Sequence, residues 1–170
     1  MREELSRADN RLHEAMQNHS HMVYRLAYAR TRNRPDAEDI YQEVFLRFAT
    51  HEIFFQSAEH QKAWLIRATV NLSINLLRSA WRRRMVPADM SMEREQPAAE
   101  MVSDSMNLAL DRLPARYRAV IHLFYFEDMS VDEIAKALDM KPSTIRTRLT
   151  RGRQRLKTLL TSDGEEVESE

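Results

Sequence analysis

The chain has 170 residues with only two glycines and five prolines, a composition that favours an all-helical protein. It contains no cysteine, which excludes disulfides and thiolate metal sites. Lys and Arg balance Asp and Glu at 26 each, but five of the acids lie in the last eight residues, so the rest of the chain is basic by five charges.

The hydropathy of the chain predicts neither a membrane span nor a signal peptide. No apolar run approaches the roughly 20 residues that a membrane-spanning helix needs. The polar start Met1–Glu4 also differs from a signal peptide. We therefore predict a cytoplasmic protein with no direct membrane insertion.

The first half of the sequence predicts three helices. Residues 9–32 carry apolar side chains on a helical period, and after a break at Asn-Arg-Pro a second helix is expected over 35–50. Residues 54–62 have the pattern of a loop or a broken turn. A long helix is expected over 63–84, with Trp64 in the core rather than stacked on a ligand.

The two halves are predicted to be separate domains. The N-terminal domain is expected over 1–86 and the C-terminal domain over 105–161. Between them, residues 87–104 mix proline with polar residues and show no steady period, which indicates a flexible linker. Residues 162–170 are expected to form an acidic disordered tail. The predicted fold class is thus all-α, with two small helical domains.

Short helices are predicted over 107–113 and 116–126, and residues 130–157 then have the pattern of two helices joined by a tight turn. Ser130 followed by Glu133 is a capping box that opens the first of this pair. Apolar residues line one face of the second, and its outward face carries Arg146, Thr147, Thr150, Arg151 and Gln154. This pattern is typical of a helix-turn-helix that reads DNA.

Charge supports a nucleic-acid partner for this segment. Seven cations follow one another without an intervening acid: Lys141, Arg146, Arg148, Arg151, Arg153, Arg155 and Lys157. A solvated amphipathic helix is the alternative, but such helices usually mix both signs. A second basic run lies over 78–84 and an acidic patch over 36–43, which suggests two kinds of partner.

Ordered motifs recur through both halves. In the first half they are Tyr24–Ala27, Asp36–Phe45, Ala63–Arg67, Asn71–Leu72 and Leu76–Arg78. In the second half they are Leu113–Arg118, Ser130–Leu138, Ser143–Leu149 and Arg151–Arg153. Over about residues 20–160 the chain resembles the minimal, two-domain bacterial sigma factors of the extracytoplasmic-function group. The resemblance implies a factor that binds core RNA polymerase, directs it to specific promoters and helps to open the DNA.

The resemblance also implies sites in the first domain. Polymerase contacts are expected at Asp39, Gln42 and Glu43, whose spacing places them on one outward helix face. A solvated face with intrahelical ion pairs is the alternative there. Recognition and melting of the minus-ten promoter element are expected at Gln56, Ser57, His60, Arg67, Asn71, Arg78, Arg82 and Arg83.

In the second domain the resemblance implies contacts with the minus-thirty-five element. The expected residues are Lys141, Ser143, Thr144, Arg146, Thr147, Arg148, Thr150 and Arg151. Arg can bind guanine in a bidentate manner and the Thr methyl can meet thymine, so the outward Arg and Thr residues are expected to read bases. Lys141, Arg148 and Arg153 are expected to contact phosphates.

Three positions depart from the family pattern. Asp139 and Arg32 stand where glycine is common, and Lys141 replaces the usual small polar cap of the recognition helix. Asp tolerates the left-handed conformation better than most residues, so the turn at Asp139 is expected to form with some strain.

An anti-sigma factor is implied as a further partner, whereas no cofactor, metal ion, small-molecule substrate or catalytic residue is expected. His19 and His21 do not form a ligand pair at helical spacing. The alternative function is a helix-turn-helix activator or repressor that acts without replacing sigma. A carboxylate-bridged metal hydrolase in a helical bundle is a third reading, but the chain lacks paired Glu-x-x-His motifs.

Overall fold

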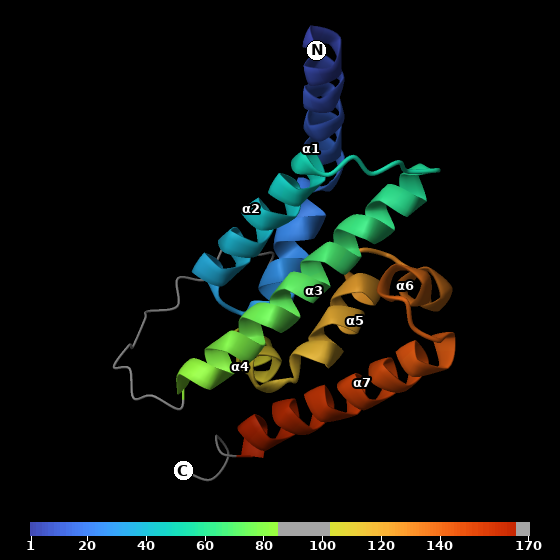
Figure 1. The fold of residues 1–170 in the computed structure, drawn as a ribbon. Coiled ribbons are helices and arrows are strands. Elements are labelled where there is room, and N and C mark those ends of the chain that lie inside the picture. The colour runs from blue at the N-terminus through green and yellow to red at the C-terminus, as the bar shows by residue number, and fades with distance from the viewer. Residues whose placement is uncertain (85–102, 166–170) are drawn as a thin grey trace. The chain divides into compact units, whose positions relative to one another are not determined.

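The computed structural model describes residues 1–84 and 103–165, and within these ranges the regular elements are all α-helices (Figure 1). The chain divides into two compact units, Met1–Arg94 and Glu95–Glu170. The predicted class, all-α with two small helical domains, is confirmed. Most of the predicted linker, 87–102, lies outside the described residues.

The first unit contains α1 (Arg2–Thr31), α2 (Arg34–Thr50) and α3 (Ala58–Arg84). Each of the three helices packs against the other two, and the N-terminal part of α1 extends beyond them (Figure 1). The fully buried core comes from apolar positions of all three helices: Val23, Leu26, Ala27, Ala37, Ile40, Val44, Phe48, Leu65 and Ile66.

The junction between α1 and α2 explains one departure from the family pattern. Arg32 ends α1 with φ 50° in the left-handed region, the conformation that glycine adopts most easily. Its guanidinium lies over the ring of Tyr28, 4.9 Å from the centroid. Asn33 then caps α2, because its side chain accepts a hydrogen bond from the Asp36 N–H at 3.0 Å.

Two helices of this unit begin earlier than predicted. α1 starts at Arg2, before the expected residue 9, since residues 2–8 contain no helix breaker and Glu3 and Glu4 favour the first turn. α3 starts at Ala58, before the expected residue 63. The Ser57 hydroxyl caps it by accepting from the His60 N–H at 3.1 Å, so the predicted loop over 54–62 ends at Ser57.

The second unit contains α4 (Asp104–Arg112), α5 (Ala115–Tyr125), α6 (Val131–Leu138) and α7 (Pro142–Glu165). α7 packs against the other three helices. Its close approach to α5 depends on Gly152, where an added Cβ would lie 2.9 Å from Ile121 Cδ1. The fully buried apolar side chains that hold the unit together are Ala109, Leu113, Val120, Leu123, Ile134 and Ile145.

The helix-turn-helix forms as predicted. Both hydrogen bonds of the capping box between Ser130 and Glu133 are present. Asp139 ends α6 in the left-handed region with φ 55°, which matches the expected strain at this position. Lys141 directly precedes α7, and its carbonyl accepts from the Thr144 N–H at 3.0 Å.

The predicted limits of the linker and the tail need small corrections. Ser103 caps α4 by accepting from the Met106 N–H at 3.3 Å, so 103–104 belong to the second helical unit rather than to the linker 87–104. α7 continues to Glu165, four residues into the predicted tail 162–170, because an established helix extends at low cost. The rest of that tail lies outside the described residues.

Candidate nucleic-acid interface and docking surface

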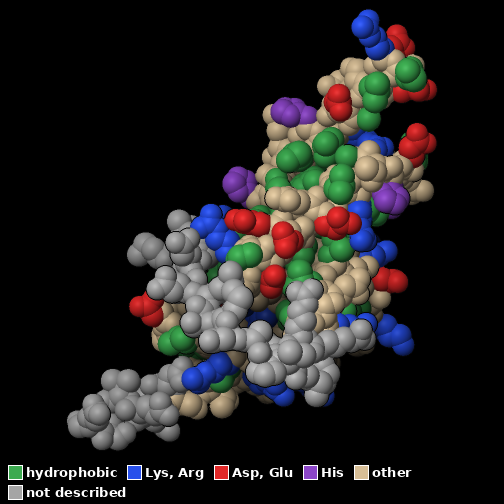
Figure 2. Space-filling model, turned by 60° about the vertical axis from the view of Figure 1, so that its left-hand side comes forward, with side chains coloured by type: hydrophobic (Ala, Val, Ile, Leu, Met, Phe, Trp, Pro, Cys, Tyr) green, Lys and Arg blue, Asp and Glu red, His purple; other side chains and the backbone are tan. Residues whose placement is uncertain are grey.

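The outward face of α2 is acidic. Asp39 and Gln42 are exposed and Glu43 is half-buried, whereas Ile40 and Val44 on the opposite face are buried. The spacing therefore separates the two faces as the sequence predicts. Figure 2, in which the side of the molecule that carries α2 comes forward, shows acidic side chains gathered on one surface with apolar groups between them.

Intrahelical ion pairs engage part of this charge. The Arg47 Nε lies 2.7 Å from a Glu43 carboxylate oxygen, and the Arg34 Nε lies 3.0 Å from one of Glu38. Such exposed pairs at i, i+4 are worth only about 0.3–0.5 kcal/mol each, so a partner can compete for the carboxylates. Leu46, three residues beyond Glu43, is 57% exposed and adds an apolar side chain to the same face.

Residues 51–57 connect α2 to α3 and lie against an aromatic cluster; we call them the recognition loop after the minus-ten role that the sequence predicts for this region. The Phe55 ring stacks on Phe48 at 5.7 Å between centroids and meets Trp64 edge-on at 6.1 Å. Trp64 also contacts Phe48 at 5.9 Å and is half-buried. Trp64 thus packs against the buried Phe48 without being fully buried itself, and Phe55 anchors the recognition loop.

Two of the predicted minus-ten residues hold the recognition loop in place. His60 Nδ1 accepts a hydrogen bond from the Gln56 N–H at 3.2 Å, and Ser57 caps α3. The side chain of Gln56 is exposed. Phe54, which the sequence did not single out, is 86% exposed beside it. The only sequence signal for Phe54 is its place next to Phe55, since neighbouring residues of an extended segment face opposite sides.

The remaining minus-ten candidates lie along α3. Arg67, Asn71 and Arg78 are exposed, and their spacing of four and seven residues places them on one helix face. His60 precedes Arg67 by seven residues and shares this face, so the stripe starts beside the recognition loop. The predicted residues Arg82 and Arg83 belong to the last turn of α3, but their side chains lie outside the described part of the chain.

The recognition helix α7 separates its residues as predicted. Ile145 and Leu149 are buried, whereas Arg146, Thr147, Thr150 and Arg151 are exposed. Lys141 and Ser143 are exposed at the start of the helix, and Thr144 is half-buried. The Thr147 hydroxyl donates to the Ser143 carbonyl at 2.9 Å, an arrangement that leaves its methyl group available for apolar contact.

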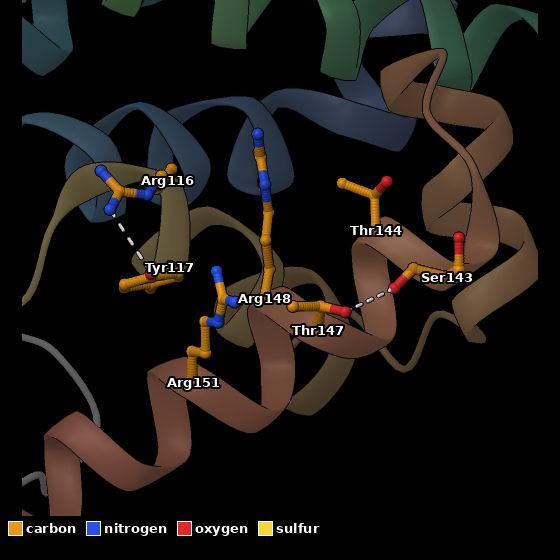
Figure 3. A pocket seen from close by; sticks show the side chains of 7 residues that line it. All are labelled: Arg116, Tyr117, Ser143, Thr144, Thr147, Arg148 and Arg151. Atoms are coloured by element: carbon orange, nitrogen blue, oxygen red, sulfur yellow. Dashed lines mark hydrogen bonds between the residues drawn. The ribbon is translucent and has the colours of Figure 1, made fainter.

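A groove of about 310 Å³ lies between the start of α7 and α5 (Figure 3). Its polar walls are formed by Arg116, Tyr117, Ser143, Thr144, Thr147, Arg148 and Arg151. The Arg116 Nη2 donates to the Tyr117 hydroxyl at 3.4 Å, and its guanidinium carbon lies 4.6 Å from the centre of that ring. Arg116 and Tyr117 were absent from the predicted site because only the packing of α5 brings them there.

Electrostatics of this groove favour an anion. Burial, followed by the positive charge of Arg116, lowers the pKa of Arg148. Among the described residues, no carboxylate forms an ion pair with Arg116, Arg148 or Arg151. Because like charges gathered without a counterion are unfavourable, a bound phosphate would relieve the repulsion.

Arg153, a predicted phosphate contact, also has a packing role within the unit. Its Nε donates to the Tyr125 hydroxyl at 2.6 Å, and its guanidinium carbon lies 5.4 Å from the centre of the Phe124 ring. The side chain therefore braces α7 against α5. The sequence predicted that the cations of this site come from α7 alone. In the structure Arg116 from α5 also lines the groove.

Comparison with known proteins bears on both units. A model described as Sigma-70 region 2 matches residues 15–83, and one described as Sigma-70, region 4 matches residues 103–156. The ECF RNA polymerase sigma factor SigE of Mycolicibacterium smegmatis is 36% identical over 163 residues, which cover 91% of this chain and 63% of SigE. The RNA polymerase sigma factor SigV of Bacillus subtilis is 30% identical over 146 residues, which cover 85% of this chain and 88% of SigV.

The chain belongs to the ECF sigma factors. Its length spans 63% of SigE but most of SigV. The fold of this sigma factor is also similar to that of RpoE from Bartonella quintana, solved in complex with the anti-sigma factor NepR. The TM-score is 0.71 at 22% identity, and the match covers 88% of this chain and 96% of RpoE.

Three further observations concern metal binding, membrane spans and a titratable group of this sigma factor. Across the two described ranges, no three or more His, Cys, Asp or Glu residues gather in a way that could hold a metal ion. None of the helices described has the length and apolar character needed to cross a membrane. Burial, and then the positive charge of Lys62, lowers the pKa of His19 on α1.

Proposed function

We propose that this sigma factor binds core RNA polymerase, brings it to promoters with two recognition elements and helps to open the DNA there. It acts in the cytoplasm, where the polymerase works, and catalyses no reaction itself. The observation that carries the proposal is the match of region 2 to the first unit and region 4 to the second. An activator or repressor with the same helix-turn-helix would leave the first unit unexplained.

The acidic face of α2 is the proposed docking surface for polymerase. Asp39, Gln42 and Glu43 offer two carboxylates and an amide on one face, and the helix is fixed from behind by buried side chains. A basic surface on the polymerase would be attracted and oriented by this face. Leu46 supplies apolar area that would be covered on docking.

The recognition loop and the exposed stripe of α3 are proposed to bind the opened strand of the minus-ten element. An unpaired base needs a surface to stack on and a polar group that reads its edge. Phe54 provides an exposed ring and Gln56 an exposed amide. The hydrogen bonds of Ser57 and His60 fix the backbone where the loop joins α3. Arg67 and Arg78 then follow the phosphates.

Permanganate reactivity of unpaired thymines tests this assignment of the recognition loop. The double variant Phe54→Ala/Gln56→Ala is expected to bind polymerase and closed promoter DNA like the parent but to open the minus-ten element poorly. A pre-melted template should restore most of the activity, because the unpairing cost has already been met. A variant that opens duplex promoters normally would remove the loop from the mechanism.

The exposed face of α7 is proposed to enter the major groove of the minus-thirty-five element. Arg146, Thr147, Thr150 and Arg151 would meet base edges there. Arg148, held in the groove with Arg116, would clamp a backbone phosphate instead. This division gives the helix its register through phosphate contacts and its specificity through base contacts.

Alanine substitutions separate these two roles. Arg146→Ala and Arg151→Ala are each expected to weaken binding by about 1–3 kcal/mol and to relax base preference in the upstream element. Lys141→Ala should weaken binding evenly across sequences and flatten its salt dependence. Titration of a set of upstream-element variants at several salt concentrations measures both effects. An equal loss on every sequence for all three variants would contradict the division.

An anti-sigma factor is proposed as a regulatory partner. The support is the solved complex of the structurally similar RpoE with NepR. Co-purification of the tagged full chain from its native cells, followed by competition with core polymerase, tests this proposal. A protein that is captured and also displaced by polymerase would support it, and a chain that brings down polymerase alone would contradict it.

A further inference from the structure

Arg11 on α1 reaches the end of α2 and the recognition loop behind it. Its Nη1 donates to the carbonyl of Ile53 at 3.2 Å. Its Nη2 lies within hydrogen-bond distance of the carbonyls of His51, at 3.3 Å, and Phe48, at 3.4 Å. One side chain therefore connects three backbone carbonyls that are 37 to 42 residues away in the sequence.

The chemistry of these contacts suits a guanidinium. The last carbonyls of a helix have no partner within the helix and carry the negative end of its dipole. A planar fork of donors can satisfy several of them together, which a single ammonium group cannot do as well. The guanidinium carbon of Arg11 also lies 5.3 Å from the centre of the Phe48 ring, so the same residue contacts the aromatic cluster under the loop.

These contacts fix the recognition loop at the end opposite to α3. Ser57 and His60 hold its last residues, and Phe55 anchors its middle on Phe48. Arg11 holds its first residues through the carbonyls of His51 and Ile53. With both ends and the middle fixed, the exposed side chains of the loop have a defined direction.

We propose that Arg11 is a positioning residue for promoter opening, because it fixes the recognition loop so that Phe54 and Gln56 face the opened strand. Arg11 lies before the region 2 match, which begins at residue 15. It would touch no base itself. The proposal rests on the proposed role of the recognition loop, so its test must distinguish a failure of Arg11 from a failure of the loop.

The test compares variants of the full chain with core polymerase on duplex promoters that differ at single minus-ten bases. Arg11→Ala removes the donors, and Arg11→Lys keeps the charge without the fork. Arg7→Ala is the matched control, since Arg7 is exposed one turn earlier on the same helix. Val23→Ala is the control for lost stability, because Val23 is a fully buried core residue of α1. The loop variant Phe54→Ala/Gln56→Ala completes the set.

Arg11→Ala is expected to lower opening roughly tenfold or more, since hydrogen bonds from a charged donor are the stronger ones. It should also flatten the base preference at the positions that the loop variant flattens. Arg11→Lys should give an intermediate loss, and Arg7→Ala none. Val23→Ala should lower opening on all promoters in proportion, without changing the preference. Binding to the upstream element should remain within about twofold for every variant, because the second unit is unchanged.

The outcomes separate the two proposals. If the loop variant opens every promoter like the parent, the proposed role of the loop fails. If the loop variant is defective but Arg11→Ala and Arg11→Lys behave like Arg7→Ala, the loop stands and the inference about Arg11 is wrong. A loss for Arg11→Ala that keeps the parent's base preference, as for Val23→Ala, would make Arg11 purely structural and would also overturn it. If Arg11→Ala does not fold, the base preference of Arg11→Lys decides in the same way.

Discussion

Reversal of charge on the α2 face should weaken polymerase binding much more than it weakens folding. The change is the double variant Asp39→Lys/Glu43→Lys. Both side chains lie away from the core. Among the described residues Glu43 pairs with Arg47 alone, at 2.7 Å, and the two side chains are 41% and 47% exposed. Loss of this pair costs about 0.3–0.5 kcal/mol. New like-charge neighbours at i, i+4 add a similar amount.

The expected loss of binding free energy is larger than the expected loss of folding stability, so the two effects can be measured separately. A total cost of about 1 kcal/mol would lower the melting temperature of a unit of this size by about 4–8 °C. Removal of one partner from a buried interfacial charge pair typically costs about 2–5 kcal/mol, or from about thirtyfold to several thousandfold in affinity. Two reversals at one interface should reach at least the lower end of that range.

The assay titrates labelled full-length chain with core polymerase and records thermal melts of the same samples. The double variant Glu3→Lys/Asp9→Lys is the control, because it makes the same charge change at exposed acids of α1. A parent-like affinity for the α2 variant would refute the docking surface. An equal loss for the control would show that net charge, rather than this face, governs binding. An unfolded α2 variant would make the two acids structural.

Three further predictions concern stability. Gly152→Leu should destabilise the second unit by about 1–3 kcal/mol in urea unfolding, because even a Cβ would lie 2.9 Å from Ile121 Cδ1; an unchanged midpoint would contradict the close approach of α5 and α7. The lowered pKa of His19 means that the unfolded chain binds the proton more readily, so stability should fall as the pH drops below 6.5. His19→Asn should reduce this loss of stability, and the exposed control His21→Asn should reduce it less. If stability falls equally steeply with pH in both variants, His19 is not the cause. Asp139→Gly should stabilise the second unit by up to about 1 kcal/mol, since φ is 55° and the left-handed conformation costs most other residues roughly 1–2 kcal/mol; a loss of stability in thermal melts would argue against strain there.

Local signals explain which parts of the fold could be predicted. The α6–α7 turn has a capping box at Ser130 and Glu133 and a continuous apolar period, so its form followed from sequence. The start of α3 was placed too late because Ser57 is followed three residues later by His60 rather than by Glu or Gln. The ring nitrogen of His60 nevertheless reaches back and accepts from the Gln56 N–H at 3.2 Å, one residue before the Ser57 cap.

The parts of the site that sequence missed depend on packing between distant segments. Arg116 enters the groove because α5 lies against α7 at Gly152, and neither the approach nor its direction is encoded by a local pattern. Arg11 contacts carbonyls 37 to 42 residues away. Arg153 is turned toward Tyr125 by the same packing. Charge and periodicity could identify the cations but not their partners.

Run-off transcription with core polymerase and a promoter library tests the central claim most directly. The account predicts that core polymerase alone starts without promoter preference. Addition of the full chain should produce discrete start sites whose upstream DNA shares two short elements at a fixed spacing. The chain with Asp39→Lys/Glu43→Lys should produce far less of these transcripts at the same concentration. Promoter-specific transcripts that do not require the chain, or no specific transcript when it is present, would contradict the account.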